Sequence, residues 1–116
     1  MKPVSKIFGI YLLIILLILI SNTSFSQVVA THFNASWNEP NKAEWVGELN
    51  DCEITYVDIS KNPKLQKKHK VVVVPTIIIF KDGEEMKRWE ADLSFKMLAT
   101  RKELQDYVNE LIEDKY

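Results

Sequence analysis

Apolar residues are distributed unevenly along this chain of 116 residues. Residues 7–20, IFGIYLLIILLILI, form one continuous apolar run without a charge. From residue 27 onward, apolar and polar residues alternate in short stretches, which is the pattern of half-buried strands and one-sided helices. The pattern therefore divides the chain into an N-terminal segment, residues 1–26, and one small domain, residues 27–116.

Strands and helices are expected to alternate in this domain. Four strands are predicted where β-branched and aromatic residues are frequent, at Gln27–Ala35, Glu53–Ile59, Thr76–Phe80 and Glu85–Ala91. Three helical segments are predicted: one that begins with Asn38 as its N-cap and continues over Lys42–Leu49, a short one over Pro63–His69, and one after the capping box Thr100–Glu103. Asp92–Ala99 fits neither pattern.

The order of these elements, β-α-β-(α)-β-β-α, predicts the fold class. Two strands that flank a helix should be parallel with a right-handed crossover. The Asp82-Gly83 pair favours a tight hairpin between the last two strands. We therefore expect an α/β fold, a three-layer α/β/α sandwich on a mixed four-stranded sheet. The first helix should cover one face of the sheet and the last helix the other.

The N-terminal segment has the form of a secretory signal peptide. Lys2 and Lys6 precede the apolar run, and Ser24 and Ser26 occupy suitable positions for cleavage before Gln27. An uncleaved membrane anchor is the alternative, although the run is shorter than the about 20 residues of a spanning helix. The protein is thus expected to be exported, periplasmic or secreted, with a membrane-anchored form facing the periplasm as the alternative.

Charge and composition exclude several function classes. The chain carries 15 Lys and Arg against 16 Asp and Glu, so it has no basic footprint for nucleic acid. It has one cysteine, which excludes a disulfide scaffold. No spacing of His, Cys, Asp or Glu suits a metal, and no cofactor is expected.

Several motifs resemble the thioredoxin family, over roughly residues 28–112. His32–Lys42 is similar to the segment in which a strand runs into Trp-Cys-Gly-Pro-Cys-Lys; Phe33, Ala35, Trp37, Pro40 and Lys42 match. Val74-Pro75-Thr76 resembles the family's cis-proline loop, and Asn62-Pro63 and Phe80–Glu84 follow the family's spacing. The resemblance implies a minimal thioredoxin core without the family's first strand and helix.

Asn38 and Asn41 stand where the resemblance places the two redox cysteines. Thiol–disulfide exchange needs an attacking thiolate and a resolving thiol, and an amide can replace neither. We therefore expect no disulfide reductase activity. His32 falls where the family has a buried Asp, and Tyr56 where it has a Lys. A His32–Tyr56 proton relay and a hydrogen-bonded core histidine are the two interpretations.

The resemblance leaves a peptide-binding surface as the main hypothesis. The family holds substrate peptides at positions that here are Trp37, Asn38, Glu39, Pro40, Asn41, Val74, Pro75 and Thr76. The backbone of Val74 would pair with an extended peptide by β-augmentation, unless the proline only shapes the turn. The expected partner is a protein or extended peptide, with no nucleic acid, and with a membrane only if residues 7–20 are retained. The alternative is a single-cysteine redox protein acting through Cys52.

Overall fold

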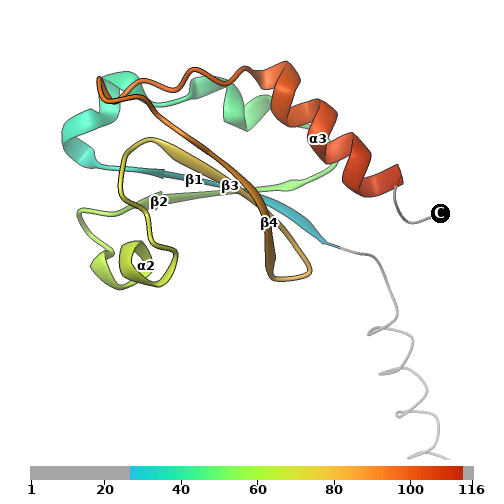
Figure 1. Ribbon diagram of the computed structural model, residues 1–116, viewed down its shortest axis with the longest axis horizontal. Helices are drawn as coiled ribbons and strands as arrows, with labels where there is room; N and C mark the ends of the chain where they lie inside the picture. Colours follow the sequence, from blue (N-terminus) through green and yellow to red (C-terminus); the bar gives the residue numbers. More distant parts are fainter. Residues whose placement is uncertain (1–26, 114–116) are drawn as a thin grey trace, which may run out of the picture.

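The computed structural model describes residues 27–113, which form a twisted sheet between two helical layers (Figure 1). The sheet has four strands in the order β2-β1-β3-β4. Their bounds are β1 Val28–Asn34, β2 Glu53–Asp58, β3 Thr76–Lys81 and β4 Glu84–Glu90. The helical elements are the 3₁₀ segments η1 Ser36–Asn41 and η2 Glu44–Glu48, and the α-helices α2 Pro63–Lys68 and α3 Arg101–Glu113.

The sheet is mixed, as the sequence predicts. β1 is the central strand and runs parallel to β2 and antiparallel to β3, while β3 and β4 form an antiparallel hairpin. Asp82 and Gly83 connect that hairpin with φ angles of 53° and 84°. Both values lie in the left-handed region that the sequence pair Asp-Gly tolerates. The four predicted strands are thus confirmed to within one residue at each end.

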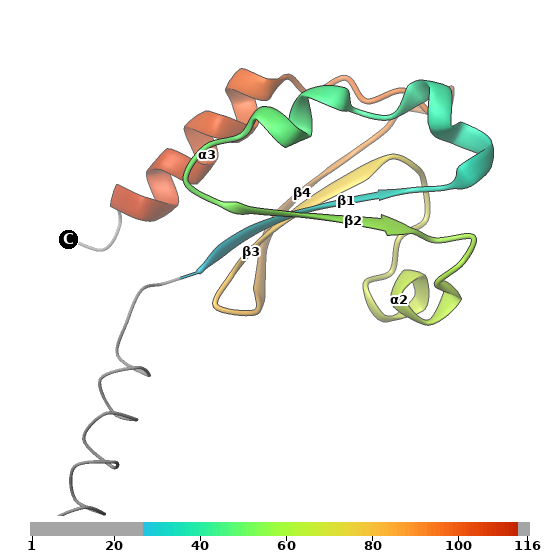
Figure 2. The ribbon, with the colours of Figure 1, turned by 180° about the vertical axis from the view of Figure 1, so that it is seen from behind.

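The arrangement of the helical layers differs from our expectation. η2 and α3 lie side by side on one face of the sheet, and the short helix α2 lies on the other side of the sheet, near one end (Figures 1 and 2). The expectation that the first and last helices lie on opposite faces is therefore wrong, although the three-layer architecture is confirmed. The reason lies in β3, where Ile77, Ile78 and Ile79 are all fully buried. A strand that is apolar on both faces does not reveal which face the long helix covers.

The stretch predicted as the first helix is not one α-helix. Its two 3₁₀ segments are separated by Lys42 and Ala43, and Lys42 has extended backbone angles. The backbone N–H of Ala43 donates to Nε2 of His32 at 3.1 Å, so a side chain of β1 takes the donor that a continuous helix would use. Asn38 is not the N-cap. Ala35 precedes η1, and Asn38 lies inside it and is buried.

α3 follows the predicted pattern closely. Thr100 caps it, with the Glu103 N–H donating to Thr100 Oγ1 at 3.3 Å. Leu104, Val108 and Leu111 are buried against the sheet.

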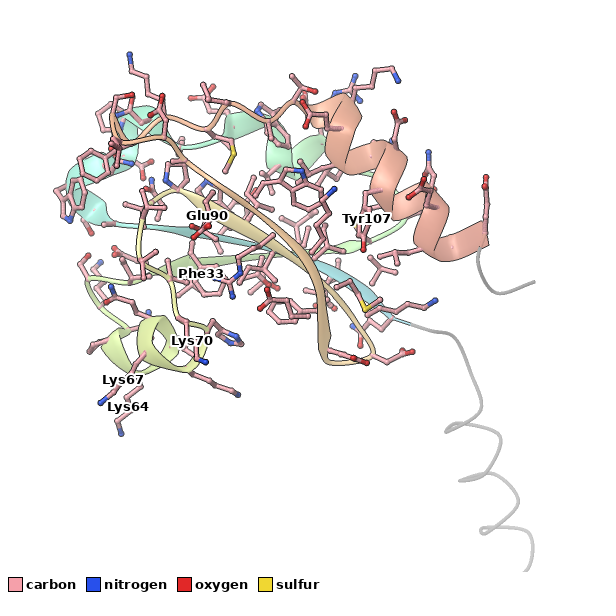
Figure 3. The ribbon with its side chains drawn as sticks, viewed as in Figure 1. Phe33, Lys64, Lys67, Lys70, Glu90 and Tyr107 are labelled. Atoms are coloured by element: carbon pink, nitrogen blue, oxygen red, sulfur yellow. The ribbon has the colours of Figure 1, made fainter. Side chains whose placement is uncertain are left out.

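Lys64 and Lys67 of α2 point away from the sheet into solvent, as expected for the solvated face of a basic helix (Figure 3). Within residues 27–113, no helix combines the length and apolarity needed to cross a bilayer; the apolar run 7–20 lies outside the described residues.

Candidate functional site

The asparagine cluster, Asn34, Asn38 and Asn41, forms at the carboxyl end of β1, where the chain enters η1. Asn38 is only 3% exposed. Asn34 Nδ2 donates to the Asn38 carbonyl at 3.2 Å, and Asn38 Nδ2 lies 3.1 Å from Asn34 Oδ1. Asn41 Nδ2 donates to Asn38 Oδ1 at 2.9 Å. The three amides therefore hold one another and fix the first turn of η1 against the strand.

Asn38 also connects η1 to two distant segments. Its Nδ2 lies 3.3 Å from the carbonyl of Val74 and 3.2 Å from the carbonyl of Phe95. Buried polar groups need such partners, because an unpaired carbonyl in this position would be destabilising. One side chain thus joins the loop after β4 and the loop before β3 to the end of β1.

The loop before β3 contains the expected cis peptide bond, between Val74 and Pro75. Val74, Pro75 and Thr76 are all buried, and Thr76 Oγ1 donates to the carbonyl of Val73 at 2.6 Å. The Pro75 carbonyl accepts from Ala91 N–H at 3.0 Å. Side chains of this loop therefore face the protein interior, and the Val74 carbonyl already has the Asn38 amide as its partner.

An aromatic patch of Trp37 and Phe95 lies next to the asparagine cluster, and Leu93 precedes Phe95 by two residues. The rings of Trp37 and Phe95 meet edge to face, with centroids 5.1 Å apart. Trp37 is 62% exposed and Leu93 is 96% exposed. The sequence motifs identify Trp37 but not Leu93 and Phe95, because Asp92–Ala99 has no regular period. Leu93 and Phe95 could have been identified as surface candidates because they are large apolar residues in a segment without a strand or helix pattern.

Glu39 and Pro40 are exposed on η1, while Asn41 is half-buried. Glu39 forms an ion pair with Lys42 at 2.8 Å. Of the eight predicted binding residues, the structure thus presents Trp37, Glu39, Pro40 and part of Asn41 to solvent. Asn38 and the Val74–Thr76 loop lie beneath them.

His32 and Tyr56 are neighbours across β1 and β2, with ring centroids 5.8 Å apart. The imidazole is buried, and this burial lowers its pKa below the ordinary value of 6.5. Because Nε2 accepts from Ala43 N–H, the neutral ring carries its proton on Nδ1. No hydrogen bond joins the imidazole to the Tyr56 hydroxyl among the described residues. This is the geometry of a hydrogen-bonded core histidine.

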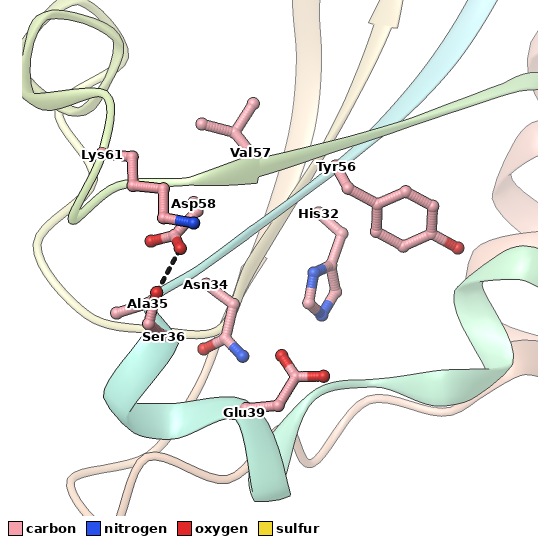
Figure 4. Close-up of a pocket in the computed structure, with 9 residues that line it drawn as sticks. All are labelled: His32, Asn34, Ala35, Ser36, Glu39, Tyr56, Val57, Asp58 and Lys61. Atoms are coloured by element: carbon pink, nitrogen blue, oxygen red, sulfur yellow. Dashed lines mark hydrogen bonds between the residues drawn. The ribbon is translucent and has the colours of Figure 1, made fainter.

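A crevice opens on the β2 side of η1, with a volume of about 480 Å³ (Figure 4). Asp58 on its wall accepts hydrogen bonds from the hydroxyls of Ser36 and Ser60. These bonds lower the pKa of the Asp58 carboxyl to about 2, so it is charged at all physiological pH values. The full lining is His32, Asn34, Ala35, Ser36, Glu39, Tyr56, Val57, Asp58 and Lys61.

Cys52 lies in the turn before β2, remote from η1 along β1 and β2. It is half-buried and packs against the core that η2 and α3 cover. Burial, with a smaller contribution from Asp51, raises the pKa of its thiol. A thiol that stays protonated at neutral pH is a poor nucleophile. Among residues 27–113, no group of three or more His, Cys, Asp or Glu side chains is placed to hold a metal ion.

Comparison with known proteins decides the family. The family model described as "Thioredoxin" matches residues 20–109. The chain belongs to the thioredoxin family. It is 33% identical over 72 residues to a thioredoxin of Mycobacterium bovis, covering 56% of this chain and 62% of that protein. It is 39% identical over 49 residues to thioredoxin Y1, chloroplastic, of Arabidopsis thaliana, covering 42% of this chain and 28% of that protein.

Solved thioredoxin structures agree in fold. A mutant thioredoxin from Halobacterium salinarum superposes with a TM-score of 0.57 at 27% identity, covering 72% of this chain and 74% of that one. A mutant thioredoxin of Entamoeba histolytica gives a TM-score of 0.53 at 27% identity, covering 75% and 84%. The matches span less than two thirds of the length of the curated relatives named above. This chain of the thioredoxin family has one cysteine, Cys52, and therefore no cysteine pair.

Proposed function

We propose that this protein is a redox-inactive thioredoxin-family binding module of the bacterial envelope, which holds a protein or an extended peptide on the surface around η1. The observation that carries the proposal is the state of Asn38, which the resemblance places at a redox position. Its side chain is buried and engaged with Asn34, Asn41, Val74 and Phe95. It holds the site together and offers no group for exchange chemistry.

The contact surface in this proposal is the aromatic patch together with Glu39 and Pro40. Exposed aromatic side chains on a fixed backbone are typical anchors of protein interfaces. The Trp37 ring packs edge to face against Phe95, and the asparagine cluster fixes η1, the segment that carries Trp37. The Val74–Thr76 loop lies behind this surface, because its side chains are buried and its Val74 carbonyl accepts from the Asn38 amide.

Reduction of insulin by dithiothreitol, followed by turbidity, tests the redox part of the proposal. We expect the wild-type protein to give the background rate, and a thioredoxin with both active-site cysteines to give a high rate in parallel. A rate above background that disappears in Cys52→Ser would contradict the proposal and favour the single-cysteine alternative. The half-buried position and raised pKa of Cys52 speak against that alternative.

Affinity capture from the cell envelope, with thiols blocked at lysis, tests the binding part. We expect a partner that remains bound in reductant, is lost with Trp37→Ala and is retained with Leu98→Ala. Leu98 is a matched control because it is 71% exposed and lies near Arg88 and Trp89 of β4. A partner released only by reductant would instead assign the function to Cys52.

A further inference from the structure

The sheet face beneath η1 and η2 changes from apolar to polar partway along β1 and β2. Near their amino ends, Ala30 of β1 and Ile54 of β2 pair in the core. The next positions on the same face are polar in both strands: His32 pairs with Tyr56, and Asn34 pairs with Asp58. Packing alone favours apolar residues on a covered sheet face. Three of these polar residues hydrogen-bond to the chain around them: His32 accepts from the Ala43 N–H, Asn34 accepts from the Asn38 amide, and Asp58 accepts from the Ser36 hydroxyl. Together with Tyr56 they form a polar wall at this end of the sheet.

These residues line the crevice, and the crevice lies at a switch point of the topology. The chain leaves β1 toward η1 on one face of the sheet and leaves β2 toward α2 on the other face (Figures 1 and 2). In open α/β sheets, ligands bind in the crevice formed outside the carboxyl ends of two such strands. The volume of about 480 Å³ lies within the usual range for small-ligand sites.

The chemistry of the walls selects a cation. Carboxylates come from opposite walls, Glu39 of η1 and Asp58 of β2, and Figure 4 shows the Glu39 side chain directed toward His32. Tyr56 is 62% exposed and contributes an aromatic side chain to the lining. Glu39 already attracts one cation, the Lys42 ammonium, in an exposed and readily exchanged pair. Lys61, at the rim beside Asp58, forms no ion pair with any described residue.

We propose that this crevice binds a single cationic side chain, arginine or lysine, of a partner polypeptide. A guanidinium group presents donors in a fork that fits carboxylates and a flat surface that stacks on an aromatic ring. The inference rests on the proposed binding function and deepens it, because the crevice and the aromatic patch flank the same segment, η1. A peptide that crosses η1 would place an apolar side chain on Trp37 and a basic one beside Glu39.

Chemical-shift titration of the purified ¹⁵N-labelled protein tests this inference. The probe is N-acetyl-L-arginine amide, and N-acetyl-L-citrulline amide is the control with nearly the same shape and no charge. We expect saturable shifts at the amides of Glu39, Tyr56 and Asp58 with the arginine probe, and binding weaker by about fivefold or more with citrulline. Equal binding of the two probes, or no saturable shift at these amides, would overturn the inference.

Variants separate this site from the aromatic patch. Glu39→Gln should weaken the arginine probe by about fivefold, whereas Glu48→Gln, an exposed change on η2 outside the crevice, should not change it. Unchanged affinity in Glu39→Gln would count against the inference. Trp37→Ala should leave the arginine probe unaffected. If captured partners depend on Trp37 but the arginine probe does not bind, the proposed function stands and the cationic pocket fails.

Discussion

At the scale of single residues, Asn38 is the most consequential side chain of the site. Its amide joins β1, η1, the loop before β3 and the loop after β4, and it is almost fully buried. Removing a buried donor leaves its acceptors unpaired, which is more destabilising than the loss of an average hydrogen bond. Asn38 therefore determines both the stability and the shape of the proposed binding surface.

Asn38→Ala should lower the free energy of unfolding by about 1–3 kcal/mol, because the Val74 and Phe95 carbonyls lose a donor. Urea denaturation followed by circular dichroism measures the change. Asn41→Ala is the matched control: Asn41 is half-buried, and one hydrogen bond joins it to the cluster. A loss in Asn41→Ala as large as that in Asn38→Ala would contradict the central position of Asn38.

Stability should fall as the pH is lowered through 6.5, because burial holds the pKa of His32 below that ordinary value. Between the native and unfolded pKa values, the unfolded chain binds a proton that the native chain does not, so acid favours unfolding. His69 acts in the same direction, since burial also lowers its pKa. His32→Gln preserves an acceptor for Ala43 N–H and should flatten this slope. Urea midpoints at several pH values check it, and an unchanged slope would exclude His32 as the titrating group.

At the scale of elements, hydrogen bonds from side chains reshape what local propensity favours. The stretch between β1 and β2 forms two 3₁₀ segments and not one helix, because two side chains of β1 bind its backbone: His32 accepts from the Ala43 N–H, and Asn34 donates to the Asn38 carbonyl. The crevice opens beside η1, over the polar ends of β1 and β2. α3, with no such competitor, matches its predicted pattern.

The β3–β4 hairpin provides a test of one element. Gly83 has a φ of 84°, and a Cβ at this position would meet no atom within 4 Å. Gly83→Ala should therefore destabilise through backbone conformation alone, by about 1–2 kcal/mol. Glu84→Ala, an exposed change at the start of β4, is the control and should have a small effect. Thermal unfolding of both variants checks this, and equal melting temperatures would show that the turn adapts.

At the scale of the whole molecule, the start of the domain and its proposed binding surface lie at opposite ends of β1. Gln27 N–H donates to Asp82 Oδ1 at 2.9 Å, beside the β3–β4 turn, whereas Trp37 follows the other end of the strand. A tether at the N-terminus would therefore leave the aromatic patch and the crevice facing away from it. The proposed envelope function is compatible with either a cleaved or a retained leader.

We expect cleavage of the leader before Gln27, on the form of residues 1–26. Intact mass measurement of the protein recovered from the cell envelope tests this prediction. A mass that corresponds to residues 27–116 is expected, with or without cyclisation of the new N-terminal glutamine. A mass that includes residues 7–20 would establish the retained anchor instead.

The sequence by itself determined the order of elements, the mixed sheet, the hairpin at Asp82-Gly83 and the family. These features follow from the alternation of apolar and polar residues, from turn-forming residue pairs and from motif spacing, each of which depends on residues close together in the sequence. It also showed that the chain has one cysteine, Cys52, and therefore no cysteine pair.

The tertiary structure alone decided which face each helix covers, the break between η1 and η2, and what Asn38 contacts. β3 is apolar on both faces, so its alternation could not orient α3. The partners of Asn38, Val74 and Phe95, lie 36 and 57 residues away along the chain, and no local pattern encodes such contacts. The crevice depends on the register of β1 and β2, because pairing across the two strands brings together polar residues that are far apart in the sequence.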